Sequence, residues 1–214
     1  MRKEDDEWLP EKLEKQLKKF NECDENTGLV YCGVYWLDES KNTMKEAKHA
    51  HFIGNVYHEL MLGDFVWMCS IPLIRTKYLK EVGGFDELMP ARQDWECWLR
   101  IAKKYKFNCV EEPLIIYHAR HGEHIGDDLT RWIIGIKRIM EKHKDYIKQN
   151  KDVERNMFFG LSEVYVIIGD YKNFFATWLH AFKIQPFNIL VNGKKLLKVF
   201  KYILLRIFYG RQEF

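Results

Sequence analysis

The 214-residue sequence lacks the features of a membrane-spanning, secreted or metal-stapled protein. No uncharged apolar run reaches the ~20 residues that a helix needs to cross a bilayer. The sequence is charged from residue 2 onward, without the apolar segment of a signal peptide. None of the five cysteines form a C-x-x-C pair, and their number is odd. We therefore expect a cytoplasmic protein with buried free thiols, rather than a disulfide framework or a zinc site.

The charge balance gives no indication of a nucleic-acid partner. The sequence has 34 basic and 31 acidic residues, for a formal net charge of +3. Its length suits one domain, or one domain with an appendage. Hydrophobic residues make up 47% of the chain, which is enough for a sizeable core.

Two neighbouring segments carry the strongest local pattern. Residues 82–87 read VGGFDE and predict a turn, because paired glycines adopt backbone angles that a Cβ disfavours. The apolar residues from Trp95 to Ala102 recur at three- and four-residue steps, which predicts a helix with one apolar face. Asp94 lies at the head of this helix. It either caps the helix by accepting backbone N–H groups or faces a cleft as a base.

These segments, together with Ile74-Arg75, resemble the second half of the catalytic domain of family 2 glycosyltransferases. Glu112-Pro113-Leu114, followed by Tyr117 and Arg120, continues the same pattern. The family comprises inverting enzymes of the GT-A nucleotide-sugar class. The resemblance implies an α/β fold over residues 1–126, a partial GT-A domain with a mixed sheet. It also implies that Asp94 is the catalytic base.

The start of the sequence resembles the metal-binding motif of the same family. In that family an Asp-x-Asp motif runs directly into a helix, and here residues 3–13 read KEDDEWLPEKL. The resemblance places the second motif aspartate on Asp5 and puts Lys3 where the first would stand. Paired carboxylates at this spacing hold a Mn²⁺ or Mg²⁺ ion against a diphosphate. Asp5 is therefore the implied metal ligand, while Lys3 removes one ligand and adds a like charge beside the metal.

Several regular elements are expected from local patterns. The segment after the acidic start predicts a helix with an apolar stripe through Leu9, Leu13, Leu17 and Phe20. A polar turn is expected at residues 38–43. Aromatic and β-branched residues predict three strands, at residues 28–37, 107–110 and 114–117. The first of these strands is expected to be buried on both faces.

Two basic residues follow the last of these strands. Arg120 and His121 match the positions where the family brings a basic group to the donor phosphates, since such a group offsets leaving-group charge. The alternative is a solvated loop, and the residues themselves favour neither.

The rest of the sequence, residues 127–214, predicts a helical region. Residues 158–186 resemble a single tetratricopeptide unit, which cannot bury its faces alone, so we expect a helical hairpin. Residues 193–211 combine a wide apolar face with basic residues over much of the rest, among them Lys194, Lys195, Lys198, Lys201 and Arg206. This pattern is typical of a helix on a membrane surface. The alternative is a helix docked on its own domain with the basic residues in water.

In the family, several strand–helix units that bind the nucleotide precede the metal motif, whereas this sequence starts at the motif. We therefore expect the C-terminal half of a glycosyltransferase, either truncated or working with a separate N-terminal half. Its partners would be a nucleotide-sugar donor, a glycan or lipid-linked acceptor, and the inner membrane face. The alternatives are an inactive remnant, a membrane-associated interaction subunit, or a helical adaptor built on residues 130–190.

Overall fold

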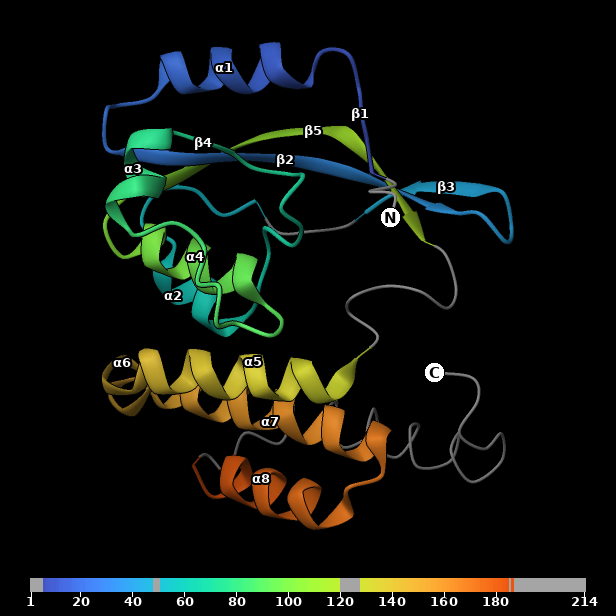
Figure 1. The fold of residues 1–214 in the computed structure, drawn as a ribbon, viewed down its shortest axis with the longest axis vertical. Coiled ribbons are helices and arrows are strands. Elements are labelled where there is room, and N and C mark those ends of the chain that lie inside the picture. Colours follow the sequence, from blue (N-terminus) through green and yellow to red (C-terminus); the bar gives the residue numbers. More distant parts are fainter. Residues whose placement is uncertain (1–5, 48–50, 120–127, 185, 187–214) are drawn as a thin grey trace. The chain divides into compact units, whose positions relative to one another are not determined.

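The computed structural model describes residues 6–47, 51–119, 128–184 and 186. The chain divides into two compact units, Met1–Asp127 and Asp128–Phe214. The first unit combines a mixed sheet with helices, and the described part of the second is helical (Figure 1). The expected α/β fold with a mixed sheet and a helical C-terminal region is confirmed.

The first unit is built on a five-stranded sheet with the order β1-β5-β2-β3, in which β4 also pairs with β2. The two long central strands run parallel, and the three short ones are antiparallel to their neighbours. The strands are β1 (Glu7–Trp8), β2 (Thr27–Asp38), β3 (Thr43–Glu46), β4 (Leu73–Ile74) and β5 (Lys106–Ala119). Residues 27–34 of β2 are all buried, so the predicted strand is confirmed and both its faces are covered up to Val34, whereas Trp36 near its end is exposed.

β5 is one continuous strand, which corrects the expectation of two short strands at residues 107–110 and 114–117. The register against β2 shifts at Gly33, which pairs with Pro113 across a bulge. A Cβ on Gly33 would lie 2.7 Å from the Glu111 carbonyl oxygen, too close for any other residue without a backbone shift. The glycine therefore lets the bulged backbone approach β2, and the strand continues through a proline that lacks an N–H donor.

Four helices flank this sheet, with α1 on one face and α2 and α4 on the other (Figure 1). They are α1 (Lys12–Glu22), α2 (Tyr57–Leu62), α3 (Thr76–Glu81) and α4 (Gln93–Ala102). The sequence did not predict α2 or α3, because six residues are too few to show a helical period.

The inward face of α1 differs from the apolar stripe that the sequence predicts. Phe20 is buried, but Leu13 and Leu17 are 44% and 53% exposed. Gln16 lies inward instead, and its side-chain amide donates to the carbonyl oxygens of Val30 and Ile71, at 2.8 and 3.0 Å. Polar contacts to the sheet therefore set the rotation of α1.

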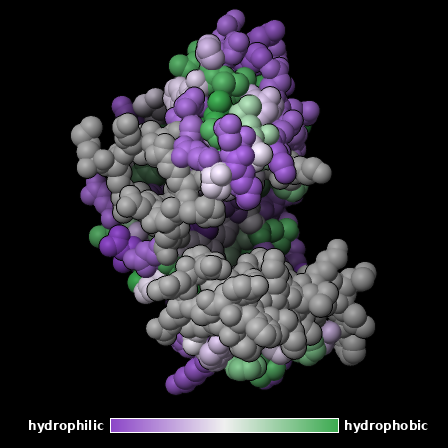
Figure 2. Space-filling model, turned by 90° about the vertical axis from the view of Figure 1, so that its right-hand side faces the viewer, coloured by the Kyte–Doolittle hydropathy of each residue, from purple (hydrophilic) through white to green (hydrophobic). Residues whose placement is uncertain are grey.

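Figure 2 shows hydrophobic residues interspersed with hydrophilic ones on the visible face of the first unit.

Lys12 is the second inward polar residue of α1 and is only 1% exposed. Its ammonium donates to Gln16 Oε1 at 2.6 Å and lies 4.2 Å from the ring centroid of Trp8. Burial lowers the pKa of Lys12. The cation–π contact holds Trp8, at the end of β1, against the helix that follows it.

The five cysteines are all free. Cys32, Cys97 and Cys109 are buried, as expected, whereas Cys23 is partly exposed and Cys69 is exposed, so the expectation of buried thiols holds for three of the five.

The second unit contains α5 (Leu129–Lys142), α6 (Lys144–Gln149), α7 (Lys151–Ile168) and α8 (Tyr171–Ile184). The predicted helical hairpin is present between α7 and α8. Gly169 ends α7 with a φ of 79°, and the Asp170 carboxylate accepts the Asn173 N–H at 3.1 Å at the start of α8.

The segment 193–211 lies outside the described residues. Among the helices that the structure describes, none is long and apolar enough to cross a membrane.

A histidine joins the ends of three strands in the first unit. His118 on β5 contacts Glu39, just after β2, at 2.7 Å and Glu7 of β1 at 2.8 Å. The Glu39 and Glu7 carboxylates raise the pKa of His118. The folded state therefore stabilises the charged imidazolium of His118. This contribution to the free energy of unfolding is lost as the pH rises through the raised pKa.

We expect His118→Gln to lower the free energy of unfolding by at most about 1 kcal/mol near pH 6, because both glutamates are exposed to solvent. The difference from the parent should shrink toward pH 9, where the imidazole is neutral in both states. Urea unfolding at the two pH values measures this. His180→Gln, which removes a single His–Glu contact at 3.2 Å, is the matched control. A His118 effect that is constant across this pH range would contradict the assignment.

Candidate active site

The turn at residues 82–87 is formed by two consecutive glycines at the end of α3, as predicted. Gly83 and Gly84 have φ values of 87° and 69°. The Gly84 N–H donates to the Leu79 carbonyl at 2.9 Å, and the Gly83 N–H donates to Lys80 at 3.0 Å. This pair of bonds is a Schellman motif, which ends the helix and reverses the chain. Glycine is needed at both positions because a side chain strains a positive φ.

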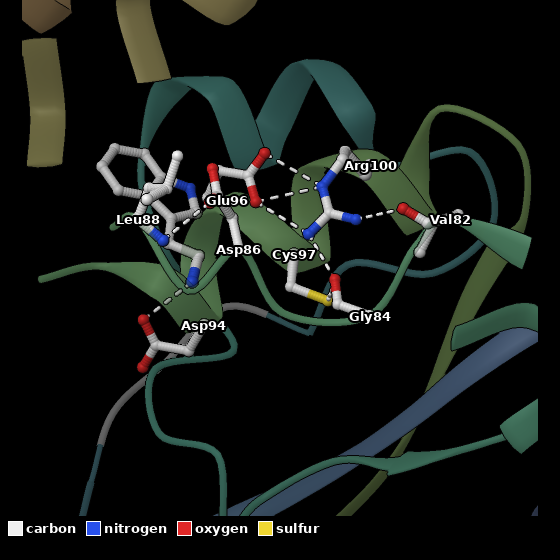
Figure 3. Close-up of polar contacts among 9 residues, drawn as sticks. Val82, Gly84, Asp86, Leu88, Asp94, Glu96, Cys97 and Arg100 are labelled. Carbon is white, nitrogen blue, oxygen red and sulfur yellow. Dashed lines mark hydrogen bonds and ion pairs between the residues drawn. The ribbon is translucent and has the colours of Figure 1, made fainter. Parts of the chain in front are cut away.

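An ion pair on α4 holds this turn in place (Figure 3). Glu96 is 0% exposed, and its carboxylate accepts from Arg100 Nε at 2.9 Å and from Nη2 at 2.8 Å. The same guanidinium donates to the carbonyl oxygens of Val82 and Gly84. Arg100 thus compensates a buried charge and connects α4 to the turn that precedes it.

A second contact fixes the other side of α4. The Trp95 indole N–H donates to the Leu60 carbonyl of α2 at 2.8 Å. Trp95, Trp98, Leu99 and Ala102 are all buried, so the predicted apolar face of this helix is confirmed. Glu96, Cys97 and Ile101 are buried as well, which means that α4 is enclosed nearly all round. The head of α4 is therefore held by contacts to two other segments.

Asp94 is the second residue of α4 and is half-buried. It is not the N-cap, which is Arg92 with a left-handed φ of 62° and no side-chain cap bond. The Asp94 carboxylate accepts the Trp95 N–H at 2.7 Å (Figure 3). Burial raises the pKa of Asp94, against the opposing effect of the Trp95 N–H and the Arg92 charge. A carboxylate with a raised pKa is a better proton acceptor, so its environment suits a general base.

A second acid, Asp64, interacts with the head of α4, and the sequence did not indicate it. Its Oδ1 accepts the backbone N–H groups of Val66 and Trp67, at 3.2 and 2.9 Å. Burial, and then the Asp94 charge, raise the pKa of Asp64 to about 7, while Arg92 opposes the shift. No local pattern could have identified Asp64, because its charged partners come from a distant segment of the chain.

The N-terminal motif also contacts the loop that precedes β4. The Ser70 hydroxyl donates to Asp6 Oδ2 at 2.5 Å. Asp5, Lys3, Arg120 and His121 lie outside the described residues, so the structure does not place them. Within the described ranges, no group of three or more His, Cys, Asp or Glu side chains could hold a metal ion. The described residues alone do not form the implied Mn²⁺ or Mg²⁺ site, and no chemical step below depends on that ion.

The sequence was compared with known families and proteins. The model of the family described as "Glycosyltransferase like family 2" matches residues 3–162. An uncharacterized glycosyltransferase of Methanocaldococcus jannaschii is 32% identical over 114 residues, which cover 53% of this chain and 39% of that protein. An uncharacterized glycosyltransferase of Rickettsia conorii is 28% identical over 123 residues, covering 56% of this chain and 20% of that protein. The matched region thus spans between a fifth and two fifths of these relatives.

We expect Arg100→Lys to lower the free energy of unfolding by about 1–3 kcal/mol, because an ammonium cannot reproduce the forked contact with Glu96 and both carbonyls. Chemical denaturation followed by circular dichroism measures this. Arg131→Lys is the matched control, because Arg131 pairs with Asp128 at an exposed site and its loss should cost less than about 0.5 kcal/mol. Equal effects of the two substitutions would show that the Arg100 contacts do not hold the turn.

Proposed function

The chain belongs to the glycosyltransferase-like family 2, and from this premise we propose that it transfers a sugar from a nucleotide-sugar donor to an acceptor hydroxyl, with inversion at the anomeric carbon. The observation that carries the proposal is the half-buried Asp94 carboxylate, which α4 holds at its head. The family resemblance implies a base at this position, and burial gives that carboxylate an increased proton affinity.

The proposed step is a single displacement. The acceptor hydroxyl gives its proton to Asp94 as its oxygen forms the new bond to the anomeric carbon. The bond from that carbon to the donor phosphate breaks on the opposite face, and its electron pair leaves with the nucleoside diphosphate. Trp95 and Glu96 position the helix, through Leu60 and Arg100 respectively, so that the base is held by packed elements.

The donor side of the reaction is proposed from the resemblance. Asp5 would face a Mn²⁺ or Mg²⁺ ion, and Arg120 and His121 would approach the donor phosphates. A glycan or lipid-linked acceptor fits this scheme, with residues 193–211 as a membrane-surface segment.

The second candidate is an interaction subunit without catalytic activity. One observation favours it: α8 leaves Tyr171, Phe175 and Leu179 exposed, and these lie at helical spacing on one face. A growth test in a strain that depends on the gene distinguishes the two candidates, because each predicts that a different substitution abolishes growth. The enzyme requires Asp94, whereas the interaction subunit would tolerate Asp94→Asn and lose its role on Phe175→Glu.

We expect Asp94→Asn to reduce donor turnover by roughly 10²–10⁴-fold, because an amide cannot accept the acceptor proton. The assay measures nucleoside diphosphate released from a panel of nucleotide sugars with added Mn²⁺ or Mg²⁺. Asp145→Asn is the matched control, since Asp145 is also an acid in the first turn of a helix but is exposed in the second unit.

Unchanged turnover in a folded Asp94→Asn chain would remove Asp94 from the mechanism. Absence of turnover in the parent chain over the whole panel would favour the interaction subunit.

A further inference from the structure

Asp64, a second carboxylate, directly follows the end of α2, and α2 is hydrogen-bonded to α4 at the residue after Asp94. We propose that Asp64 and Asp94 form an electrostatically coupled pair in which Asp64 is a positioning residue that sets the basicity of Asp94. The inference rests on the proposed role of Asp94 as the base, and it adds a residue to which neither the sequence pattern nor the family resemblance assigned a role. It follows from how two distant segments meet, how the Asp64 side chain is held, and which charges act on it.

Contacts between α2 and α4 bring the two segments together. The Gly63 N–H donates to the Glu59 carbonyl at 3.1 Å and closes the last turn of α2, so that Asp64 begins the following loop. The Trp95 indole joins the Leu60 carbonyl of α2 to the residue directly after Asp94. The end of α2 and the head of α4 are therefore tied through neighbours of the two acids.

The Asp64 side chain is held in one orientation. Its Oδ1 accepts two backbone N–H groups from its own loop, those of Val66 and Trp67. Trp67 has a φ of 67°, an uncommon backbone conformation for a bulky residue and one that a packed loop must enforce. The remaining oxygen, Oδ2, is shielded from solvent and has no hydrogen-bond partner among the described residues.

An asparagine at position 64 could make the same two loop contacts without a buried charge. The carboxyl group of Asp64 is therefore not required to build the loop, and ionising it without solvent for Oδ2 is costly. The charges of Asp94 and Arg92 act on Asp64 in opposite directions, the first raising its pKa and the second lowering it. Arg92 compensates part of the negative charge, so the site accommodates one carboxylate more readily than two.

Two carboxyl groups in this arrangement titrate as a pair. The charge of an ionised Asp94 opposes ionisation of Asp64, and together with burial it raises the pKa of Asp64 to about 7. The coupling is reciprocal, so an ionised Asp64 increases the proton affinity of Asp94. When Asp94 takes the acceptor proton, the repulsion between the two carboxylates is relieved. The pair therefore supports proton transfer best above the pH at which Asp64 ionises.

The test uses Asp64→Asn, which retains the loop hydrogen bonds, and two measurements on the full chain. The first is carbon NMR titration of the aspartate carboxyl groups, which needs no turnover. One carboxyl of the parent should titrate near pH 7 and be absent in Asp64→Asn. In Asp94→Asn its midpoint should fall by about one unit or more, because the like charge is gone.

The second measurement is the pH profile of kcat/KM. The parent should rise through an inflection near pH 7, and Asp64→Asn should lose that inflection while its KM stays unchanged. Asp170→Asn, at a helix-capping acid of the second unit, is the control and should retain the inflection. A merely structural role for Asp64 would not move the inflection.

The outcomes separate this inference from the proposed function. An Asp64 midpoint that does not respond to Asp94→Asn overturns the pair, even in an active enzyme. An unchanged pH profile in Asp64→Asn also overturns it and leaves Asp94 as the base. Coupled titration without turnover in any variant supports the pair and contradicts the transferase.

Discussion

The buried charge of Glu96 is the constraint on which the candidate site depends. A carboxylate without solvent contact must be compensated, and Arg100, one helical turn later, does this with a forked contact. The guanidinium N–H groups also reach the carbonyl oxygens of Val82 and Gly84. The two positive-φ glycines that end α3 are thereby fixed to α4. One ion pair thus sets the path by which the chain enters the helix that carries Asp94.

The chemistry at the head of α4 follows from the same enclosure. Because α4 is covered nearly all round, Asp94 is half-buried, and the bond between Trp95 and Leu60 ties α4 to α2, the helix that Asp64 follows. The negative charge of Asp94 raises the pKa of Asp64, and the positive charge of Arg92 opposes this shift. The single displacement proposed for this chain requires such a site, because the acceptor hydroxyl must lose its proton while its oxygen attacks.

Local patterns in the sequence predicted the elements that depend on local physics. β2 has a continuous apolar run, the glycine pair requires positive φ, and α4 has a regular apolar period, so each was recognisable. The resemblance gave a role to Asp94 but none to Asp64. Asp64 could not be found from sequence, since its surroundings come from residues far along the chain. The prediction of the inward face of α1 was wrong for the same reason, because Gln16 is held inward by carbonyl oxygens of other segments.

The central claim is that this chain contributes to a nucleotide-sugar site. The most direct measurement is calorimetric titration of the folded full chain with a panel of nucleoside diphosphates, with and without Mn²⁺. The account predicts saturable binding of at least one nucleotide that depends on the metal and weakens in Asp5→Ala. A folded sample that releases no binding heat with any nucleotide would contradict a donor site in this chain.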